Sequence, residues 1–457
     1  MNLAIDRPLA RRLGSLAVPV VIAMVSQTLI NWVDHILIGR LPASDSIPGQ
    51  AALGPALNLF WAVGGALAAI SVGTQAMTAR RLGEQDHARA GQVLFNALTV
   101  AAATSALASA AGWVLAPWMF HFVNPNPAVY RLGVPYLQWR MAGVFAMVVT
   151  TAYKSWFDGL GRTRVFMTVA ITMNLINFVL NIALIFGKWG FPALGMEGSG
   201  IASMISSYVG LVLLIGWSLR ARYRETYDCY HVRNLVGKQQ WELIKLSAPS
   251  ALATAFVMSG FGLFYKIVGV LDARAGHGEL YSAATQNIIV ILMAFFTGCM
   301  AYGTATATLV GQSMGAKQYD LAERYGWEAV KIGVYITLFV GALVFILPDT
   351  VLHVFTKDEA VIAVARPIMR ICGALLPFVL SALVLTQALF GAGNTKFVMF
   401  VEFGLHFFCL VPLAYLFGIV AGWGVIGVWM GAFAYILLLC TIMGWKFAEG
   451  AWKEIRI

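Results

Sequence analysis

Charged side chains are scarce in this sequence. Asp, Glu, Lys and Arg make up 11% of its 457 residues, whereas hydrophobic residues make up 60% and the mean hydropathy is +0.77. A soluble globular protein carries about 25% charged residues. The deficit excludes an ordinary soluble domain and predicts that most of the chain lies in a lipid bilayer. The net charge of +10 follows short basic segments between apolar runs, so we expect no nucleic-acid partner.

Motifs of enzymes and metal sites are also absent. The sequence holds no Gly-x-x-x-x-Gly-Lys-[Ser/Thr], no His-x-x-x-His and no Cys-x-x-Cys, which argues against ATP hydrolysis and structural zinc. Its five cysteines show no paired spacing, so we expect small core residues and no disulfide framework: Cys229, Cys299, Cys372, Cys409 and Cys440. No nucleophile–base constellation is visible. We therefore predict no enzymatic activity and no organic cofactor.

What the sequence does contain is a series of long apolar runs. A membrane span needs about 20 apolar residues. The short basic head Met1–Arg12 leads directly into the first run, so we expect a span there and no separate signal peptide. The runs predict twelve spans, near 15–38, 53–79, 92–116, 133–157, 165–187, 194–219, 244–271, 282–310, 326–347, 362–390, 397–418 and 424–445.

The positive charges predict the orientation of these spans. Lys and Arg gather before the first span and after every second one, whereas the other connecting segments hold little more than Arg40, Arg131, Lys188, Arg274 and Lys357. Cytoplasmic loops carry the excess of Lys and Arg. We therefore expect both termini to be cytoplasmic in a multi-pass protein of a bacterial-type plasma (inner) membrane.

The two halves of the chain repeat each other. Leu16-Ala-Val-Pro19 matches Leu246-Ser-Ala-Pro249, and Gly159-x-Gly-Arg-Thr-Arg164 matches Gly391-x-Gly-Asn-Thr-Lys396. Six spans per half, an even number, give both copies the same orientation, related by an axis along the membrane normal. We predict an all-α polytopic protein with twelve transmembrane helices in two six-helix lobes, 1–219 and 244–457, joined by a cytoplasmic linker, 220–243.

The first span carries a polar stripe. Gln27, Asn31 and Asp34 stand at i, i+4 and i+7, so a helix places them on one face. A carboxylate in a span is costly and usually faces a protein interior or a water-filled cavity. Two readings stay open: a structural cluster satisfied by neighbouring helices, or a cation or proton site in a transport pathway.

The fifth span is rich in asparagine. Asn174, Asn177 and Asn181 lie at intervals that bring the last two one turn apart. They either form interhelical hydrogen bonds or supply neutral oxygen ligands facing Asp34, with Ser199 or Ser203 of span six completing the shell. Such oxygen ligands suit Na⁺, and no other metal site is expected.

Charged residues elsewhere in the spans are further candidates. Glu402 and His406 share a face at i, i+4 and form either a mutually satisfied pair or a second titratable site. Lys266 either snorkels outward or lines a cleft opposite Asp34. Arg140 and Arg370 occupy repeated positions, which favours a scaffold role over substrate contact.

With these residues identified, the chain resembles the multidrug and toxic compound extrusion (MATE) family along essentially its whole length. The resemblance rests on several markers together: Pro19, Val33-Asp34-His-Ile-Leu-Ile-Gly39, the Gly-x-Gly-x-Thr turns at 159–163 and 391–395, the asparagine-rich fifth span, and Gly83 with its copy Gly315.

The resemblance implies a secondary antiporter that exports organic, often cationic and amphipathic compounds in exchange for H⁺ or Na⁺ by rocker-switch alternating access. Asp34 would be the coupling-ion site, with Asn177 and Asn181 as amide ligands. Some relatives place an Asp where this chain has Asn181, and others carry acids in spans seven and ten, where this chain offers Lys266 and Arg370. The coupling ion therefore stays open.

Two further expectations complete the sequence-based view. The alternative function is a lipid or lipid-linked-saccharide flippase of the same superfamily, because Arg140, Lys266 and Arg370 would suit an anionic headgroup. As partners we expect the lipid bilayer and a small organic substrate, and we expect the protein to be a monomer.

Overall fold

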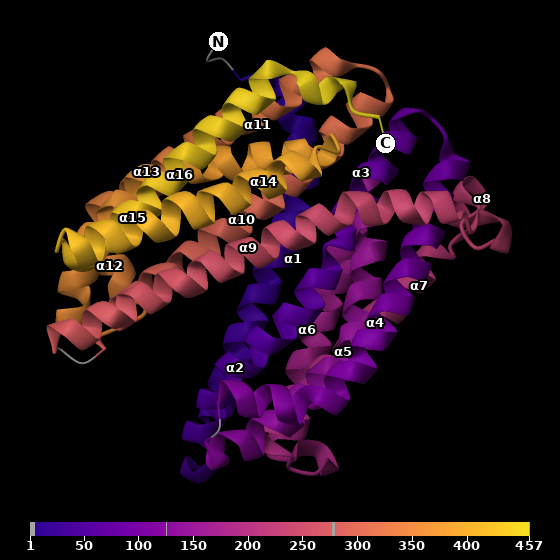
Figure 1. Ribbon diagram of the computed structural model, residues 1–457. Helices are drawn as coiled ribbons and strands as arrows, with labels where there is room; N and C mark the ends of the chain where they lie inside the picture. The colour runs from indigo at the N-terminus through magenta and orange to yellow at the C-terminus, as the bar shows by residue number, and fades with distance from the viewer. Residues whose placement is uncertain (1–4, 125, 277–278, 457) are drawn as a thin grey trace. The chain divides into compact units, whose positions relative to one another are not determined.

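The computed structural model describes residues 5–124, 126–276 and 279–456, and these form helices and connecting turns (Figure 1). Twelve of the helical segments are long and apolar enough to cross a membrane, which confirms the predicted number of spans. The first six spans are α1 (Arg7–Gly39), α2 with α3 (Ala43–Ala68 and Ile70–Gly83), α4 (His87–Val123), α5 (Pro127–Gly159), α6 (Thr163–Phe186) and α7 (Gly195–Ser218).

The last six spans repeat this order with one irregular member. They are α9 (Gly237–Ala275), α10 (Leu280–Gly315), α11 (Tyr319–Ile346), α13 (Glu359–Gly391), the eleventh span from α14 (Thr395–Leu405) onward, and α16 (Gly424–Glu449). Short elements fill the connections: η1 (Lys188–Gly190), α8 (Ala221–Tyr227), η2 (Val232–Asn234), α12 (Pro348–His353) and η5 (Ala451–Glu454).

The eleventh span is interrupted by two π-helical turns. After α14 come η3 (His406–Leu410), α15 (Val411–Tyr415) and η4 (Leu416–Val420). Pro412 near the start of α15 cannot donate a backbone hydrogen bond, which disfavours a regular α-helical ladder there. π-Turns inside α-helices occur frequently at functional sites, and this span differs from its neighbours in containing two of them.

The predicted duplication is visible in the helices. α5 and α13 each have 33 residues and begin at Pro127 and Glu359, and α6 and α14 begin at Thr163 and Thr395, so both pairs are 232 residues apart. The two copies also have the same central helix. α5 packs against α2, α3, α4 and α7, and α13 packs against α10, α11 and α16.

The Gly-x-Gly segments form tight turns, as their position after α5 and α13 predicts. Gly161 and Gly393 have φ of +71° and +88°, a conformation that favours glycine. Gly159 and Gly391, the first glycines of the pairs, lie so close to Thr78 and Ala307 that a Cβ atom would collide with them. Both glycines of each turn are therefore required by the backbone.

The chain divides into two compact units. One, called the N-terminal unit, is Val18–Ala251, and the other, called the C-terminal unit, combines the chain up to Ala17 with Leu252–Arg456. These limits differ from the predicted lobes 1–219 and 244–457, because α1 and α9 are continuous helices that each run from one unit into the other. Asp6 shows that the start of the chain belongs to the C-terminal unit, because its carboxylate pairs with Arg324 at 2.7 Å.

The segment predicted as a linker, 220–243, belongs to the N-terminal unit. Asn96 on α4 donates from Nδ2 to the carbonyl of Asn234 at 2.7 Å and to Oε1 of Gln239 at 2.8 Å. The Tyr227 ring lies 5.2 Å from that of Trp156. Buried polar and aromatic contacts therefore hold this connecting segment against α4 and α5.

Candidate functional site

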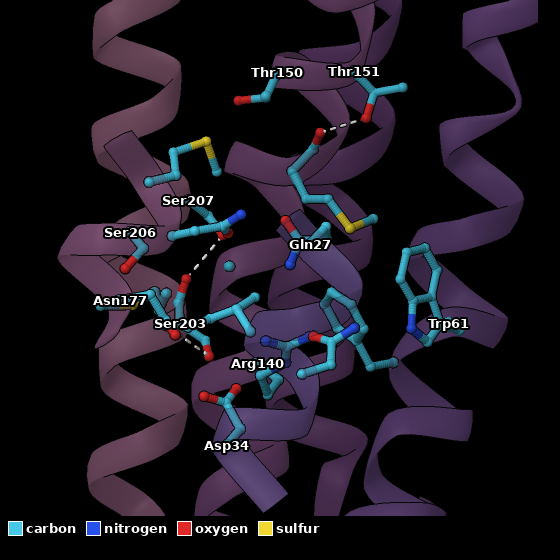
Figure 2. A pocket seen from close by; sticks show the side chains of 18 of the residues that line it. Gln27, Asp34, Trp61, Arg140, Thr150, Thr151, Asn177, Ser203, Ser206 and Ser207 are labelled. Atoms are coloured by element: carbon cyan, nitrogen blue, oxygen red, sulfur yellow. Dashed lines mark hydrogen bonds between the residues drawn. The ribbon is translucent and has the colours of Figure 1, made fainter. Parts of the chain in front are cut away.

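A polar cavity of about 220 Å³ lies within the N-terminal unit (Figure 2). Five helices, α1, α2, α5, α6 and α7, contribute its lining. The lining residues are Gln27, Ile30, Asn31, Asp34, Phe60, Trp61, Arg140, Gly143, Met147, Thr150, Thr151, Phe166, Met173, Asn174, Asn177, Ser203, Met204, Ser206 and Ser207. The stripe of Gln27, Asn31 and Asp34 therefore faces one polar space.

Asp34 is 7% exposed and is held by the asparagines of α6. Nδ2 of Asn181 donates to Oδ1 of Asp34 at 2.5 Å and to Oδ1 of Asn177 at 2.9 Å. Nδ2 of Asn177 in turn lies 3.3 Å from Oγ of Ser203 on α7. Three helices are thus joined by one chain of hydrogen bonds that ends on the carboxylate.

The direction of these bonds leaves acceptor oxygens free. Because Asn181 uses its amide hydrogens toward Asp34 and Asn177, its own Oδ1 has no hydrogen-bond partner among the described residues, although the side chain is completely buried. Oγ of Ser199 is likewise buried without a partner in that part of the chain. Buried polar atoms normally find a partner, so these oxygens have unused acceptor capacity, although neither Asn181 nor Ser199 is among the residues that line the cavity.

The other predicted polar residues are divided between this cavity and its surroundings. Asn174 lines the cavity but donates to Oγ of Ser26 at 2.8 Å, away from Asp34. Ser199 is not among the lining residues and makes no hydrogen bond to the asparagines, whereas Ser203 does both. The structure therefore joins Asp34, Asn181, Asn177 and Ser203 and leaves Ser199 outside that chain.

Arg140 brings a positive charge into the same cavity. Its guanidinium lies 4.1 Å from the centre of the Phe60 ring, and its Nε is buried without a hydrogen-bond partner among the described residues. Arginine stays charged in proteins. Within those residues no Lys or Arg forms an ion pair with Asp34, so the carboxylate and the guanidinium share the space without neutralising each other directly.

Several lining residues escaped the sequence analysis. The side chains of α5 carried a readable signal, because Gly143, Met147, Thr150 and Thr151 stand at i, i+4, i+7 and i+8 on one helix face. Ser206 and Ser207 follow Ser203 at similar spacing. Phe60 and Trp61 on α2 had no such signal, since aromatic residues are common in apolar runs.

The remaining candidates lie in the C-terminal unit. Glu402 and His406 are buried, with Nδ1 of His406 3.4 Å from Oε2 of Glu402. Lys266 and Arg370 are exposed on α9 and α13. Within the described residues no group of three His, Cys, Asp or Glu side chains is arranged to hold a metal ion.

Twelve apolar helices, an internal duplication and a polar cavity inside one helical unit define the architecture of a polytopic membrane transporter. The MatE family model matches residues 19–183 and 249–416, one segment in each half. The chain belongs to this family, which confirms the resemblance found in the sequence.

Relatives and solved structures agree with this assignment. The chain is 24% identical over 451 residues to "Probable multidrug resistance protein NorM" of Thermotoga maritima, covering 97% of this chain and 93% of the relative. It is 25% identical to "Multidrug resistance protein NorM" of Vibrio vulnificus, covering 95% and 94%. It is 24% identical to "Uncharacterized transporter YisQ" of Bacillus subtilis, covering 92% and 90%.

Two solved structures have the same fold. One is described as the outward-facing conformation of a multidrug resistance MATE family transporter of the MOP superfamily, and the other as a MOP superfamily transporter from Pyrococcus furiosus with a binding pocket of reverse polarity. Each has a TM-score of 0.88 and 20% identity, and each comparison covers 98% of this chain and 97% of the other. The chain is therefore a multi-pass membrane protein with the MATE transporter fold.

Proposed function

We propose that this protein is a secondary active antiporter that exports organic, amphipathic, drug-like compounds in exchange for H⁺ or Na⁺. The observation that carries the proposal is the environment of Asp34. This buried carboxylate borders a polar cavity, accepts a hydrogen bond from Asn181, and has no ion-pair partner among the described residues. The names of the NorM relatives support export of drugs.

Ion binding would act through the charge of Asp34. A buried carboxylate without an ion-pair partner is costly in its ionised form, and a bound H⁺ or Na⁺ lowers that cost. A ligand shifts an equilibrium between two conformations only by binding one of them better. We infer that the ion enters from outside, neutralises Asp34 and favours release of the substrate, and that it leaves to the cytoplasm after the lobes reorient.

Both candidate ions are compatible with the surroundings of Asp34. A proton requires the carboxylate alone, whereas Na⁺ requires several oxygen ligands. Asn177 and Asn181 supply amide oxygens near Asp34, and Oδ1 of Asn181 has no other partner in the described chain. Transport measured with a pH gradient and with a Na⁺ gradient, each imposed separately, therefore identifies the coupling ion.

The lining of the cavity suits an amphipathic compound. Phe60 and Trp61 offer aromatic surface, and three methionines, Met147, Met173 and Met204, offer flexible apolar contacts. Methionine adapts to ligands of different shape, and ligand pockets commonly combine apolar walls with a few polar groups. The hydroxyl groups of α5 and α7 would supply the hydrogen bonds.

We further propose the membrane setting in which this exchange occurs. The asymmetry of Lys and Arg favours cytoplasmic termini, and the bacterial NorM relatives favour the inner membrane of a bacterial-type cell. In this orientation the substrate leaves the cytoplasm while the ion enters it, as export against a gradient requires.

Replacing Asp34 by Asn tests the proposal. In proteoliposomes with a pH gradient or a Na⁺ gradient imposed separately, we expect wild-type protein to export an organic dye such as ethidium under one of them. Asp34→Asn should abolish gradient-driven export while expression and thermal stability are kept. Asp45→Asn is the matched control, because Asp45 lies on α2 in an exposed pair with Arg131. Normal export by Asp34→Asn would contradict the proposal.

One observation favours a second function, lipid flipping. Arg140 lies in the cavity with a buried Nε that has no partner among the described residues, and an anionic headgroup would satisfy it. Scrambling of a fluorescent anionic lipid that requires Arg140 and shows no competition by organic cations would favour this alternative.

A further inference from the structure

A second buried polar cluster lies in the C-terminal unit, in the irregular eleventh span. Glu402 on α14 is 7% exposed, His406 at the start of η3 is 0% exposed, and Tyr435 on α16 is 6% exposed. The hydroxyl of Tyr435 donates to Oε2 of Glu402 at 3.0 Å. The Tyr435 and His406 rings lie 4.6 Å apart, centre to centre.

The hydrogen bonds assign the tautomer of His406. Its Nδ1 lies 2.8 Å from the backbone carbonyl oxygen of Glu402. A carbonyl oxygen accepts only, so Nδ1 carries a hydrogen and donates it. Nε2 of the same ring is buried and has no hydrogen-bond partner among the described residues. A charged imidazolium would leave an N–H group unsatisfied at that position, which is costly. His406 is therefore neutral, with a free lone pair on Nε2.

Glu402 then has no cation to balance it. Among the described residues no Lys or Arg side chain forms an ion pair with Glu402, and its carboxylate accepts a hydrogen bond from the Tyr435 phenol. Within η3 the other titratable group is the buried thiol of Cys409. The adjacent residues of α9, Gly260 and Phe261, carry no titratable group. An unpaired buried carboxylate is strongly disfavoured, whereas a protonated carboxyl group is not.

Helix α9 packs against one side of this cluster. A Cβ atom at Gly260 of α9 would collide with the imidazole of His406, so the α9 backbone lies directly against the ring. Phe261 covers the ring edge at 5.9 Å between centres. On the other side the π-turn η3 begins at His406, and Val411 donates to the carbonyl of that residue, five positions back. A change in this helical turn would move the imidazole relative to Glu402.

We propose that Glu402, with Tyr435 and His406 beside it, forms a second proton-binding site that is loaded and emptied during the transport cycle. The proton binds to the carboxylate of Glu402 and leaves from it, and no other bond is made or broken. Nδ1 of His406 lies 3.4 Å from Oε2 of Glu402, and the neutral ring leaves the carboxylate as the group that takes up the proton. The role of Glu402 in transport rests on the proposed antiport. The existence of the proton-binding site does not depend on that proposal.

Infrared difference spectroscopy of the full-length protein, recorded between acidic and alkaline pH, tests the site. Protonated carboxyl groups give C=O bands that disappear on ionisation. Exposed carboxyl groups titrate as well, so the comparison is between variants: a titrating C=O band of Asp34→Asn should be missing when Glu402→Gln is added. Glu359→Gln is the control and should keep that band, because Glu359 is an exposed glutamate of the same unit. Identical difference spectra for Asp34→Asn with and without Glu402→Gln would overturn the proposal.

A second variant covers the case in which Glu402→Gln does not fold. Tyr435→Phe removes only the hydroxyl that donates to Glu402. Hydrogen bonding lowers a carboxyl C=O frequency, so the band assigned to Glu402 should move to higher wavenumber in Tyr435→Phe. An unchanged frequency would show that the band belongs to another carboxyl group and would refute the assignment.

Proton counting tests the role in transport. Proteoliposomes loaded with a pH indicator report the protons moved per substrate, and Glu402→Gln should lower that number by one while export continues through Asp34. An unchanged number would refute a role of Glu402 in the cycle. Failure of the Asp34 proposal gives a different result, namely normal export by Asp34→Asn, so the two failures are distinguishable.

Discussion

At the scale of single residues, the amide groups of α6 determine how Asp34 is presented. Asn181 directs its two amide hydrogens to Asp34 and Asn177, and its oxygen remains without a partner in the described chain. An aspartate at this position would turn the donor into an acceptor and place two carboxylates side by side. The choice of Asn over Asp therefore gives this site one acid with a neutral neighbour.

Removal of the Asn181 amide should change ion coupling in opposite directions for the two candidate ions. A hydrogen bond to a charged group contributes about 1.5–3 kcal/mol and stabilises ionised Asp34, so Asn181→Leu should raise the apparent affinity for H⁺ about tenfold or more. For Na⁺ the affinity should fall, because the variant lacks Oδ1 of Asn181 as an oxygen ligand. Efflux measured against ion concentration in proteoliposomes gives this value. Asn174→Leu is the matched control on the same helix, because Asn174 binds Ser26 and not Asp34. Equal changes in both variants would refute the assigned role of Asn181.

Arg140 should set the charge preference of the cargo. Its guanidinium borders the cavity, so Arg140→Gln removes a positive charge from the space that we assign to the substrate. Charges near a protein surface interact by about 1–4 kcal/mol at short range, and we expect cationic substrates to bind at least severalfold more tightly in the variant. Binding of a cationic and an anionic dye, measured by fluorescence, shows the change.

Arg131→Gln provides the comparison for Arg140→Gln. Arg131 lies in the same helix, α5, but its side chain is 66% exposed and pairs with Asp45. It should leave the affinities for both dyes unchanged. If the two arginine variants behave alike, a general effect of net charge explains the result and the local role of Arg140 is refuted.

At the scale of elements, the segment between the two halves is packed against the N-terminal unit. It was predicted as a cytoplasmic linker, and α8 and η2 lie on α4 and α5 through Asn96, Tyr223 and Tyr227. Burial there raises the pKa of the Cys229 thiol to about 12. At neutral pH the thiol is therefore protonated and enclosed, and both conditions suppress its reactivity.

This packing predicts the reactivity of Cys229. Asn96→Ala removes an amide that donates to Asn234 and Gln239, which leaves buried acceptors unsatisfied at a cost of about 1–3 kcal/mol. Maleimide labelling of Cys229, followed by mass spectrometry, should be slow in the wild type and about tenfold faster in the variant. Thr104→Ala on the exposed face of α4 should not change the rate. Fast labelling of the wild type would contradict the packing.

The physics of the bilayer explains which elements could be predicted from the sequence. A span must be long and apolar, so the sequence alone was sufficient for twelve helices and for their duplication. The π-turns η3 and η4 depend on how one helix packs against its neighbours, and Pro412 was the only local sign of them. The polar stripe of α1 was readable because helical spacing determines a face, whereas its aromatic partners on α2 depend on tertiary packing.

At the scale of the whole molecule, two six-helix copies provide different chemistry. The N-terminal unit holds Asp34 beside amides, and the C-terminal unit holds Glu402 beside a phenol and an imidazole. The position of Glu402 and His406 on one helix face was expected from their spacing. Tyr435 was not, because it comes from another span. Contacts between spans are thus the part of the site that one sequence does not reveal.

The continuity of α1 and α9 has a consequence for motion. Within the described residues the chain leaves one compact unit for the other at Ala17 and at Ala251, each time inside an unbroken helix. Pro19 and Pro249 lie within two residues of these points, and proline weakens a helix by omitting one backbone hydrogen bond. Any swivel between the units must bend both helices near these prolines. The duplication has thereby placed a proline beside both points at which the chain passes between the units.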